Sequence, residues 1–368
     1  MLIEAGAIGD LISVLKRRGY QVIGPALRDG AILYDHLEKL EDLPAGWTAD
    51  ADAGRYRVRR RDDAALFGYA VGPHSLKKFF HPADIQVLAA HSDNGLFRIL
   101  PHTERPPRCA FLGVRACDLA AVAVQDRVLL GDRYVDAVYQ NHRRDAFIAA
   151  VNCAVAAATC FCASMGTGPA VRGGFDLALT EILDAGRHCF VVEAGSELGA
   201  GVLAELPHQE VSEADCSRAR EVVERTTASL QRRLETDGIK DLLYQSFEHP
   251  RWDQVATRCL ACANCTMVCP TCFCVTVEDS SDVTSQVAER RRKWDSCFTL
   301  GFTYIHGGSV RQSVKSRYRQ WMTHKLAAWI DQFGTSGCVG CGRCITWCPV
   351  GIDITEEAAA FRRQGDGS

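Results

Sequence analysis

Several motifs that would indicate nucleotide binding or hydrolysis are absent from this 368-residue sequence. No G-x-G-x-x-G follows a strand-like run and no G-x-x-x-x-G-K-[ST] is present, so neither a dinucleotide fold nor a P-loop is supported. The hydrolase motifs G-x-S-x-G and H-E-x-x-H are also missing. We therefore expect no catalytic residues in this chain.

The chain also lacks long apolar runs and a marked excess of either charge. No run approaches the roughly 18–20 apolar residues that span a bilayer. The formal net charge of -3 argues against nucleic acid or an anionic membrane as a partner. The start, Met1 to Glu4, has no basic stretch followed by an apolar core, which would indicate a secretory signal. We therefore expect a cytoplasmic protein without a membrane span.

Cysteine, by contrast, is abundant. The sequence has 18 cysteines, and 11 of them lie between Cys259 and Cys348. Disulfides are rare in the reducing cytoplasm, so such crowding indicates metal ligation or redox chemistry.

Two copies of one cysteine motif bracket this segment. Each has the form C-x-x-C-x-x-C-x-x-x-C-P, from Cys259 to Pro270 and from Cys338 to Pro349. In ferredoxins with two clusters, three cysteines of such a run bind one [4Fe–4S] cluster and the fourth binds the other. The motif therefore predicts two clusters, with these cysteines as metal ligands through iron. The predicted ligands are Cys259, Cys262, Cys265 and Cys348 for cluster 1, and Cys338, Cys341, Cys344 and Cys269 for cluster 2.

A zinc site is the alternative interpretation of these runs. Zinc ribbons usually show two C-x-x-C pairs, whereas both runs here are complete and end in proline. The tight C-x-x-C turns would supply backbone N–H groups to the sulfurs, and Gly340 and Gly342 would let the second run wrap closely. The pattern therefore favours iron–sulfur clusters.

The first part of the chain has the pattern of a small α/β domain. Apolar runs at residues 109–114, 146–151 and 189–192 alternate with helical stretches, which is typical of a largely parallel sheet. Asp118 follows the first run and is expected to cap a helix.

Four further cysteines are expected to meet at one edge of this sheet. Cys117 and Cys153 come just after the ends of two apolar runs, and Cys160 and Cys162 lie on the loop after Cys153. Ligand sites collect at the carboxyl edge of parallel strands, so the four thiols are predicted to converge. They would suit a third [4Fe–4S] cluster or a zinc ion, and free or catalytic thiols are the other interpretation.

The remaining cysteines are expected to have other roles. Cys109 and Cys189 begin their apolar runs and are expected at the opposite edge of a parallel sheet. Cys272, Cys274 and Cys297 exceed the eight ligands needed, and free cysteine is commonly a small buried hydrophobe. Alternatively, one of these three replaces an assumed ligand, or they bind a further metal.

The gap between the two cysteine runs is long for a ferredoxin. Sixty-eight residues separate Cys269 from Cys338. Apolar and aromatic residues recur there at steps of three and four from Val314 to Phe333, and Gly334 follows at a C-cap position. This pattern predicts a helix that packs over the clusters. The predicted domains are an α/β domain over residues 1–210, a helical linker over residues 211–245, and an α-helical ferredoxin-like domain with two [4Fe–4S] clusters over residues 246–368.

Segments of both regions resemble one electron-transfer family. The sequence is similar to the beta subunit of cytoplasmic [NiFe] sulfhydrogenases and to the electron-transfer dicluster subunit of anaerobic sulfite reductase. The resemblance covers most of the chain from about residue 65 onward. The segments that carry it are Gly72 to Phe79, Gly113 to Ala120, Thr159 to Pro169, Cys259 to Cys274 and Gly337 to Asp353.

The resemblance implies an iron–sulfur subunit of a heteromeric cytoplasmic oxidoreductase. A sister subunit would carry FAD and bind NAD(P)H, and another would carry the catalytic metal centre, either a [NiFe] site or a sirohaem. This chain would relay electrons between them, with a hydrogenase favoured. The alternatives are the dicluster subunit of anaerobic sulfite reductase and a heterodisulfide reductase-like subunit in which the extra thiols react.

Overall fold

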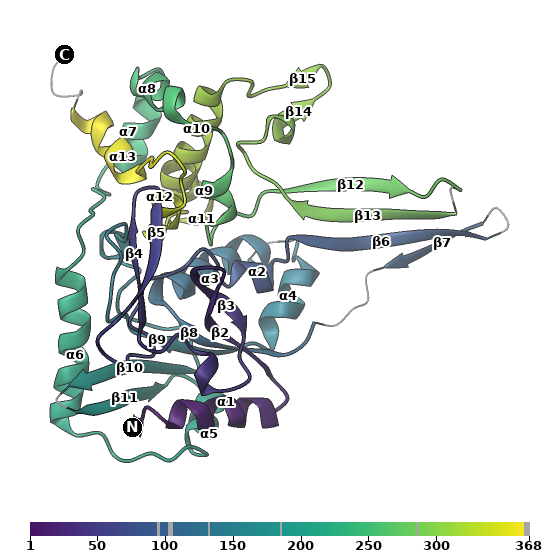
Figure 1. Cartoon of the computed structure of the whole chain (residues 1–368). Helices are drawn as coiled ribbons and strands as arrows, with labels where there is room; N and C mark the ends of the chain where they lie inside the picture. The colour runs from purple at the N-terminus through teal and green to yellow at the C-terminus, as the bar shows by residue number, and fades with distance from the viewer. Residues whose placement is uncertain (94–95, 102–105, 132, 185, 285, 364–368) are drawn as a thin grey trace.

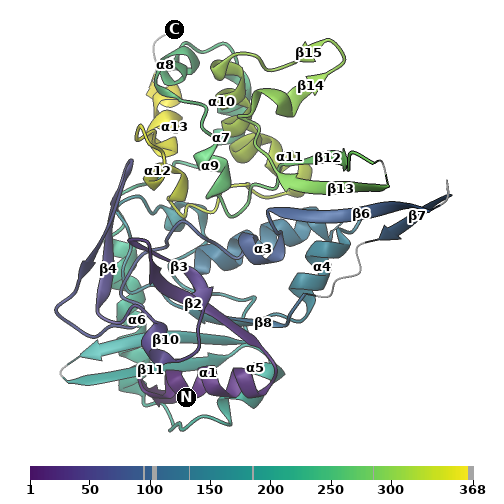
Figure 2. The ribbon, with the colours of Figure 1, turned by 45° about the vertical axis from the view of Figure 1, so that its right-hand side comes forward.

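The computed structural model describes residues 1–93, 96–101, 106–131, 133–184, 186–284 and 286–363. Figure 1 shows a sheet-rich part that contains the N-terminus and, above it, a second part that ends in α13. The turned view in Figure 2 shows the same division, with strands of the two parts lying side by side on the right.

The first part is built on a mixed sheet with the strand order β1-β11-β10-β9-β8-β2-β3. Its central strands β10, β9, β8 and β2 are parallel, and antiparallel strands flank them on both sides. The prediction of an α/β first part is thus confirmed. The strands are β1 (Leu2–Glu4), β2 (Gln21–Arg28), β3 (Ala31–His36), β8 (Cys109–Val114), β9 (Phe147–Val151), β10 (Leu177–Asp184) and β11 (Arg187–Ala194).

Helices cover both faces of this sheet because its central strands are apolar on both faces. In β8, Leu112 packs in one core cluster with Leu11 of α1. The preceding residue, Phe111, points to the other face and packs with Val122 of α3 and Tyr139 of α4. Figure 1 shows α1 and α5 below the sheet, with α3 and α4 above it. The helices of this part are α1 (Ala7–Arg17), η1 (Leu40–Asp42), α2 (Lys77–Phe80), α3 (Ala116–Leu129), α4 (Ala137–Arg144), η2 (Cys162–Met165), α5 (Glu197–Leu203) and α6 (Glu213–Ala228).

Two hairpins connect the first part with the second. The hairpin of β4 (Trp47–Asp52) and β5 (Arg55–Arg60) reaches the second cysteine run, where Gly54 N donates to Ile345 O at 3.1 Å. The other hairpin contains β6 (Asp84–Asp93) and β7 (Leu96–Pro101), and it pairs with a hairpin of the second part in the order β12-β13-β6-β7.

The hairpin of the second part contains β12 (Val275–Ser281) and β13 (Val287–Trp294) and lies between the two cysteine runs. The α-helical ferredoxin-like architecture expected for this part is therefore not confirmed. Basic residues of β13 pair with acidic neighbours, as Arg290 does with Asp279 and Arg291 with Asp84. The β6–β7 and β12–β13 hairpins extend together away from the body of the molecule (Figures 1 and 2).

The rest of the second part is mainly helical. The helix predicted from Val314 to Phe333 is confirmed, with a π-helical segment inside it and Gly334 at its C-cap with φ 67°. Tyr318 and Trp321 are buried in its core with Trp252. The elements are α7 (Ile239–Gln245), α8 (Arg251–Arg258), α9 (Asn264–Met267), η3 (Leu300–Thr303), β14 (Tyr304–Ile305), β15 (Gly308–Ser309), α10 (Val314–Thr323), the π segment (His324–Ala328), α11 (Trp329–Phe333), α12 (Arg343–Thr346) and α13 (Ile354–Arg363).

Candidate metal centres

The first cysteine run wraps around a pocket at the end of α8. Helix α8 ends at Arg258, and the next residues turn tightly, with positive φ angles at Ala261 (50°) and Ala263 (66°). All four cysteines predicted for cluster 1, including the distant Cys348, line this one pocket, and so does Cys344, which is predicted for cluster 2. Aromatic residues close it, because Phe298, Tyr318 and Trp321 also line it.

Backbone N–H groups point at two of the sulfurs of this pocket. Ala261 N donates to Cys259 Sγ at 3.4 Å, and Ile352 N donates to Cys348 Sγ at 3.3 Å. Such hydrogen bonds stabilise a thiolate and are one of the ways in which a protein sets a cluster's potential.

The second run turns in the same way, with glycine at the two strained positions. Gly340 has φ 63° and Gly342 has φ 73°, a conformation that residues with a side chain rarely adopt. Gly340 N donates to Cys338 Sγ at 3.5 Å. Cys269 of the first run is buried close enough to raise the pKa of both Cys338 and Cys341. Burial, and after it Cys338, Cys341 and Cys269, raises the pKa of Cys344, so the four cysteines predicted for cluster 2 are brought together as well.

Buried thiols of both sites other than Cys269 resist ionisation on their own. Burial raises the pKa of Cys265 and Cys344 well above the ordinary value, with further rises from neighbouring thiols, and it raises the pKa of Cys338 to about 12. A thiol must lose its proton to bind a metal. A positively charged iron centre between the sulfurs would make that ionisation favourable, so these residues fit a group of this kind.

Cys269 has a different environment, which the sequence did not reveal. A hydrogen bond from Cys272 is the largest cause that lowers the pKa of Cys269, and the ammonium of Lys325 lowers it further. Lys325 Nζ lies 3.2 Å from Cys269 Sγ. Cys274 hydrogen-bonds with Cys297, and this contact lowers the pKa of Cys274 to about 7.

The predicted third set of cysteines lies against the second run. Phe161 N, between Cys160 and Cys162, donates to Gly340 O at 2.8 Å. A Cβ on Gly340 would approach Cys162 Cα to 2.7 Å, so only glycine permits this packing. Cys117 packs in one core cluster with Cys162 and Cys341.

The fourth member of this set, Cys153, is held near Arg115. Arg115 lowers the pKa of Cys153 through its charge, although burial is the larger effect and raises it overall. Arg115 Nη2 donates to the carbonyls of Phe67 (2.8 Å) and Tyr69 (3.1 Å). Over the described ranges, no three His, Cys, Asp or Glu side chains are arranged to hold a single metal ion. Ligation by this set stays a prediction.

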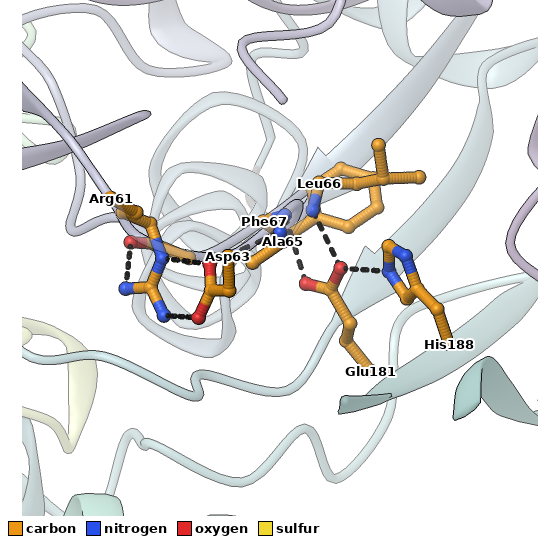
Figure 3. A network of polar contacts seen from close by, with 8 residues as sticks. Arg61, Asp63, Ala65, Leu66, Phe67, Glu181 and His188 are labelled. Atoms are coloured by element: carbon orange, nitrogen blue, oxygen red, sulfur yellow. Dashed lines mark hydrogen bonds and ion pairs between the residues drawn. The ribbon is translucent and has the colours of Figure 1, made fainter. Parts of the chain in front are cut away.

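The loop that binds Arg115 is itself anchored by a buried carboxylate. Figure 3 shows Glu181 accepting from the backbone N–H groups of Leu66 at 2.6 Å and Phe67 at 2.9 Å. His188 Nε2 lies 2.8 Å from the same carboxylate. Glu181 on β10 thus fixes the carbonyls that orient Arg115 beside Cys153.

Two expectations from the sequence are wrong here. Asp118 does not cap α3: Arg115 occupies the N-cap position, and Asp118 instead receives a hydrogen bond at 3.1 Å from Arg343 of the second run. Cys189 does not lie at the opposite edge, because β11 runs antiparallel to β10 and Cys189 pairs with Ile182 near the carboxyl end of β10. It packs with Leu2 and so stays outside the third set.

No helix in the described part of the chain is long and apolar enough to cross a membrane.

Comparisons with known proteins agree with the cysteine geometry. Residues 258–352, which contain both cysteine runs, match the family model described as a 4Fe-4S dicluster domain. Sulfhydrogenase 2 subunit beta of Pyrococcus furiosus is 34% identical over 244 residues, which is 66% of this chain and 70% of that protein. No solved structure gives a significant match. The prediction of iron–sulfur binding in this segment is thus confirmed.

Proposed function

Because the chain belongs to the family of Sulfhydrogenase 2 subunit beta, we propose that it is the electron-transfer iron–sulfur subunit of a heteromeric oxidoreductase. The two cysteine runs hold two [4Fe–4S] clusters with the ligands assigned above. The set of Cys117, Cys153, Cys160 and Cys162 holds a third. The chain itself makes and breaks no substrate bonds.

The position of the fourth cysteine of each run beside the other run is the observation that supports this proposal. Cys348, with its neighbour Cys344, lines the pocket of the first three cysteines of the other run. Cys269 lies close enough to Cys338 and Cys341 to affect the pKa of both. Such an exchange keeps two redox centres close together in one protein. Close centres are what a relay of single electrons requires, whereas a structural zinc site has no need of a second one.

The positions of the three sets favour a linear path. The third set abuts the second run through Phe161, and the second run shares its exchanged cysteines with the first. At the other end, Cys262 is exposed and the neighbouring Leu260 is 63% exposed. An electron would therefore enter or leave at the first site, and the third set would serve the opposite end.

The residues around the clusters set position and potential. A bound [4Fe–4S] cluster supplies the chemistry of accepting and releasing one electron. The N–H groups of Ala261, Gly340 and Ile352 favour negative charge on the sulfurs. Tyr318 and Trp321 exclude water from the first site, and lower exposure also shifts the potential.

The partners are a subunit that carries FAD and binds NAD(P)H, and a subunit with the catalytic metal. A [NiFe] hydrogenase is favoured for the latter because the matched relative is a sulfhydrogenase subunit. A sirohaem subunit, as in anaerobic sulfite reductase, is the alternative. The complex is expected in the cytoplasm.

Anaerobic purification of the chain with its partners tests the proposal. Three clusters predict about 12 iron atoms per chain and two predict about 8, with matching acid-labile sulfide. Cys160→Ser should lower the higher count to the lower one. Cys216→Ser, a cysteine on α6 outside all three sets, is the matched control and should leave the count unchanged. Colourless protein with stoichiometric zinc and no iron would contradict the proposal.

A further inference from the structure

Lys325 is a buried lysine in an unusual helical turn. It lies in the π-helical segment His324–Ala328, between α10 and α11 (Figure 1), and is 6% exposed. Single π-helical turns inside α-helices are rare and occur frequently at functional sites. A buried ammonium is costly unless it is hydrogen-bonded and its charge is balanced. The groups that contact the Lys325 ammonium therefore indicate its role.

Its ammonium converges on the end of the first cysteine run. Nζ lies 3.2 Å from Cys269 Sγ, 3.1 Å from Thr271 Oγ1 and 3.2 Å from Gly337 O. Cys272 Sγ is slightly farther away, at 3.5 Å. These acceptors are sulfur, hydroxyl and carbonyl groups, and none is a carboxylate. The thiolate that Cys269 would present as a ligand is thus the negative charge in hydrogen-bond contact with this lysine.

The backbone of the same residue holds the start of the second run. Lys325 O accepts from Gly337 N at 2.8 Å and from Ser336 Oγ at 3.3 Å. Thr271 Oγ1, which lies 3.1 Å from Cys269 Sγ, donates to Gly337 O at 2.6 Å. Lys325 therefore touches both the exchanged cysteine and the residue that precedes Cys338.

We propose that Lys325 is a positioning residue that fixes the Cys269 sulfur beside the second cysteine run and makes the cluster bound there easier to reduce. The inference rests on the proposed function, which assigns Cys269 to that cluster. Reduction adds a negative charge to the cluster. A positive charge hydrogen-bonded to a ligand sulfur stabilises the reduced form more than the oxidised form.

The test compares Lys325→Met, Lys325→Gln and Lys325→Arg in the complex purified anaerobically with its partners. Redox titration followed by EPR gives the midpoint potential of each cluster. Both neutral variants should lower the reduction equilibrium constant of one cluster at least about tenfold, which is about 59 mV for one electron. Lys325→Arg should keep most of the original value. Lys315→Met removes the same charge from the same helical stretch, where Nζ donates to Asp253, and should change none of the cluster potentials.

Each outcome decides the inference. Neutral variants that leave every cluster potential unchanged would overturn it, and so would a shift that Lys325→Arg or Lys315→Met reproduces in full. If neither neutral variant retains the iron that Lys325→Arg retains, the charge is needed to hold the sulfur and the positioning role stands. An unmodified complex without iron would instead contradict the proposed function, so the two failures are distinguishable.

Discussion

The buried ion pair between Arg343 and Asp118 joins the second cysteine run to the first part of the chain. Arg343 Nη1 lies 2.8 Å from Asp118 Oδ1, and the two side chains are 1% and 0% exposed. The guanidinium also donates to Gly72 O at 2.8 Å and to His74 O at 3.0 Å. Arg343→Met would leave the Asp118 carboxylate buried without its partner. Removing one member of a buried pair typically costs about 3–5 kcal/mol of folding free energy.

Anaerobic urea denaturation, followed by tryptophan fluorescence and visible absorption, measures this cost. With a slope of about 3 kcal/mol per molar urea, the midpoint should fall by roughly 1–1.7 M. Asp118→Asn should cost less than Arg343→Met, because Arg343 would still donate to two carbonyls. The double variant should cost less than the sum of the single ones, since the two residues interact directly.

The exposed pair of Lys240 and Asp331 provides the control. Lys240→Met removes a cation whose Nζ lies 2.8 Å from Asp331 Oδ1 at the surface, and it should leave the midpoint nearly unchanged. The reasoning is refuted if Arg343→Met shifts the midpoint no more than Lys240→Met does. It is also refuted if the effects of the two buried substitutions simply add.

Three further predictions concern the cysteine sites. Cys348→Ser should abolish the EPR signal of the cluster bound by the first run and spare the other; loss of the signal that Cys344→Ser removes would instead contradict the exchange. Gly340→Ala should lower the bound iron, because the added Cβ would meet Cys162 Cα at 2.7 Å, whereas Gly334→Ala has open space at a similar φ and should keep its iron. Chelation of iron at pH 7 should be accompanied by more proton uptake than the released sulfide accounts for, because burial raises the pKa of the Cys344 thiol well above its ordinary value. A pH-stat that records no uptake beyond that of the sulfide would show that the freed thiols stay ionised.

The sites that the sequence predicted best are those encoded by local spacing. Cysteines two or three residues apart must wrap around one point, so the motif predicted the first three ligands of each run as neighbours in space. The proposed exchange of Cys269 and Cys348 follows from the same motif. The apolar runs that became β8 and β9 were equally local, because a strand buried on both faces needs few polar residues.

Features that depend on contacts between segments far apart in the sequence could not be predicted from local patterns. Asp118 was interpreted as a helix cap because its partner Arg343 is 225 residues away along the chain. Cys189 was placed at the wrong edge because nothing local shows that β11 reverses direction. The strand β13 lies between the cysteine runs and pairs with β6, and no periodicity within either segment identifies its partner.

Close backbone packing makes the third cysteine set and the second run one structural unit. Added Cβ atoms at Gly340 and Gly342 would lie 2.7 Å from Phe161 O and 2.3 Å from Thr159 O, so the loop and the run can approach only without side chains there. Arg343, in the same run, binds Asp118, the residue after Cys117. The spacing between these two sets of thiols is therefore fixed by backbone contact and a buried ion pair rather than by the chain that links the two parts. In the proposed relay, substitutions at this contact should therefore alter the centres at both sets together.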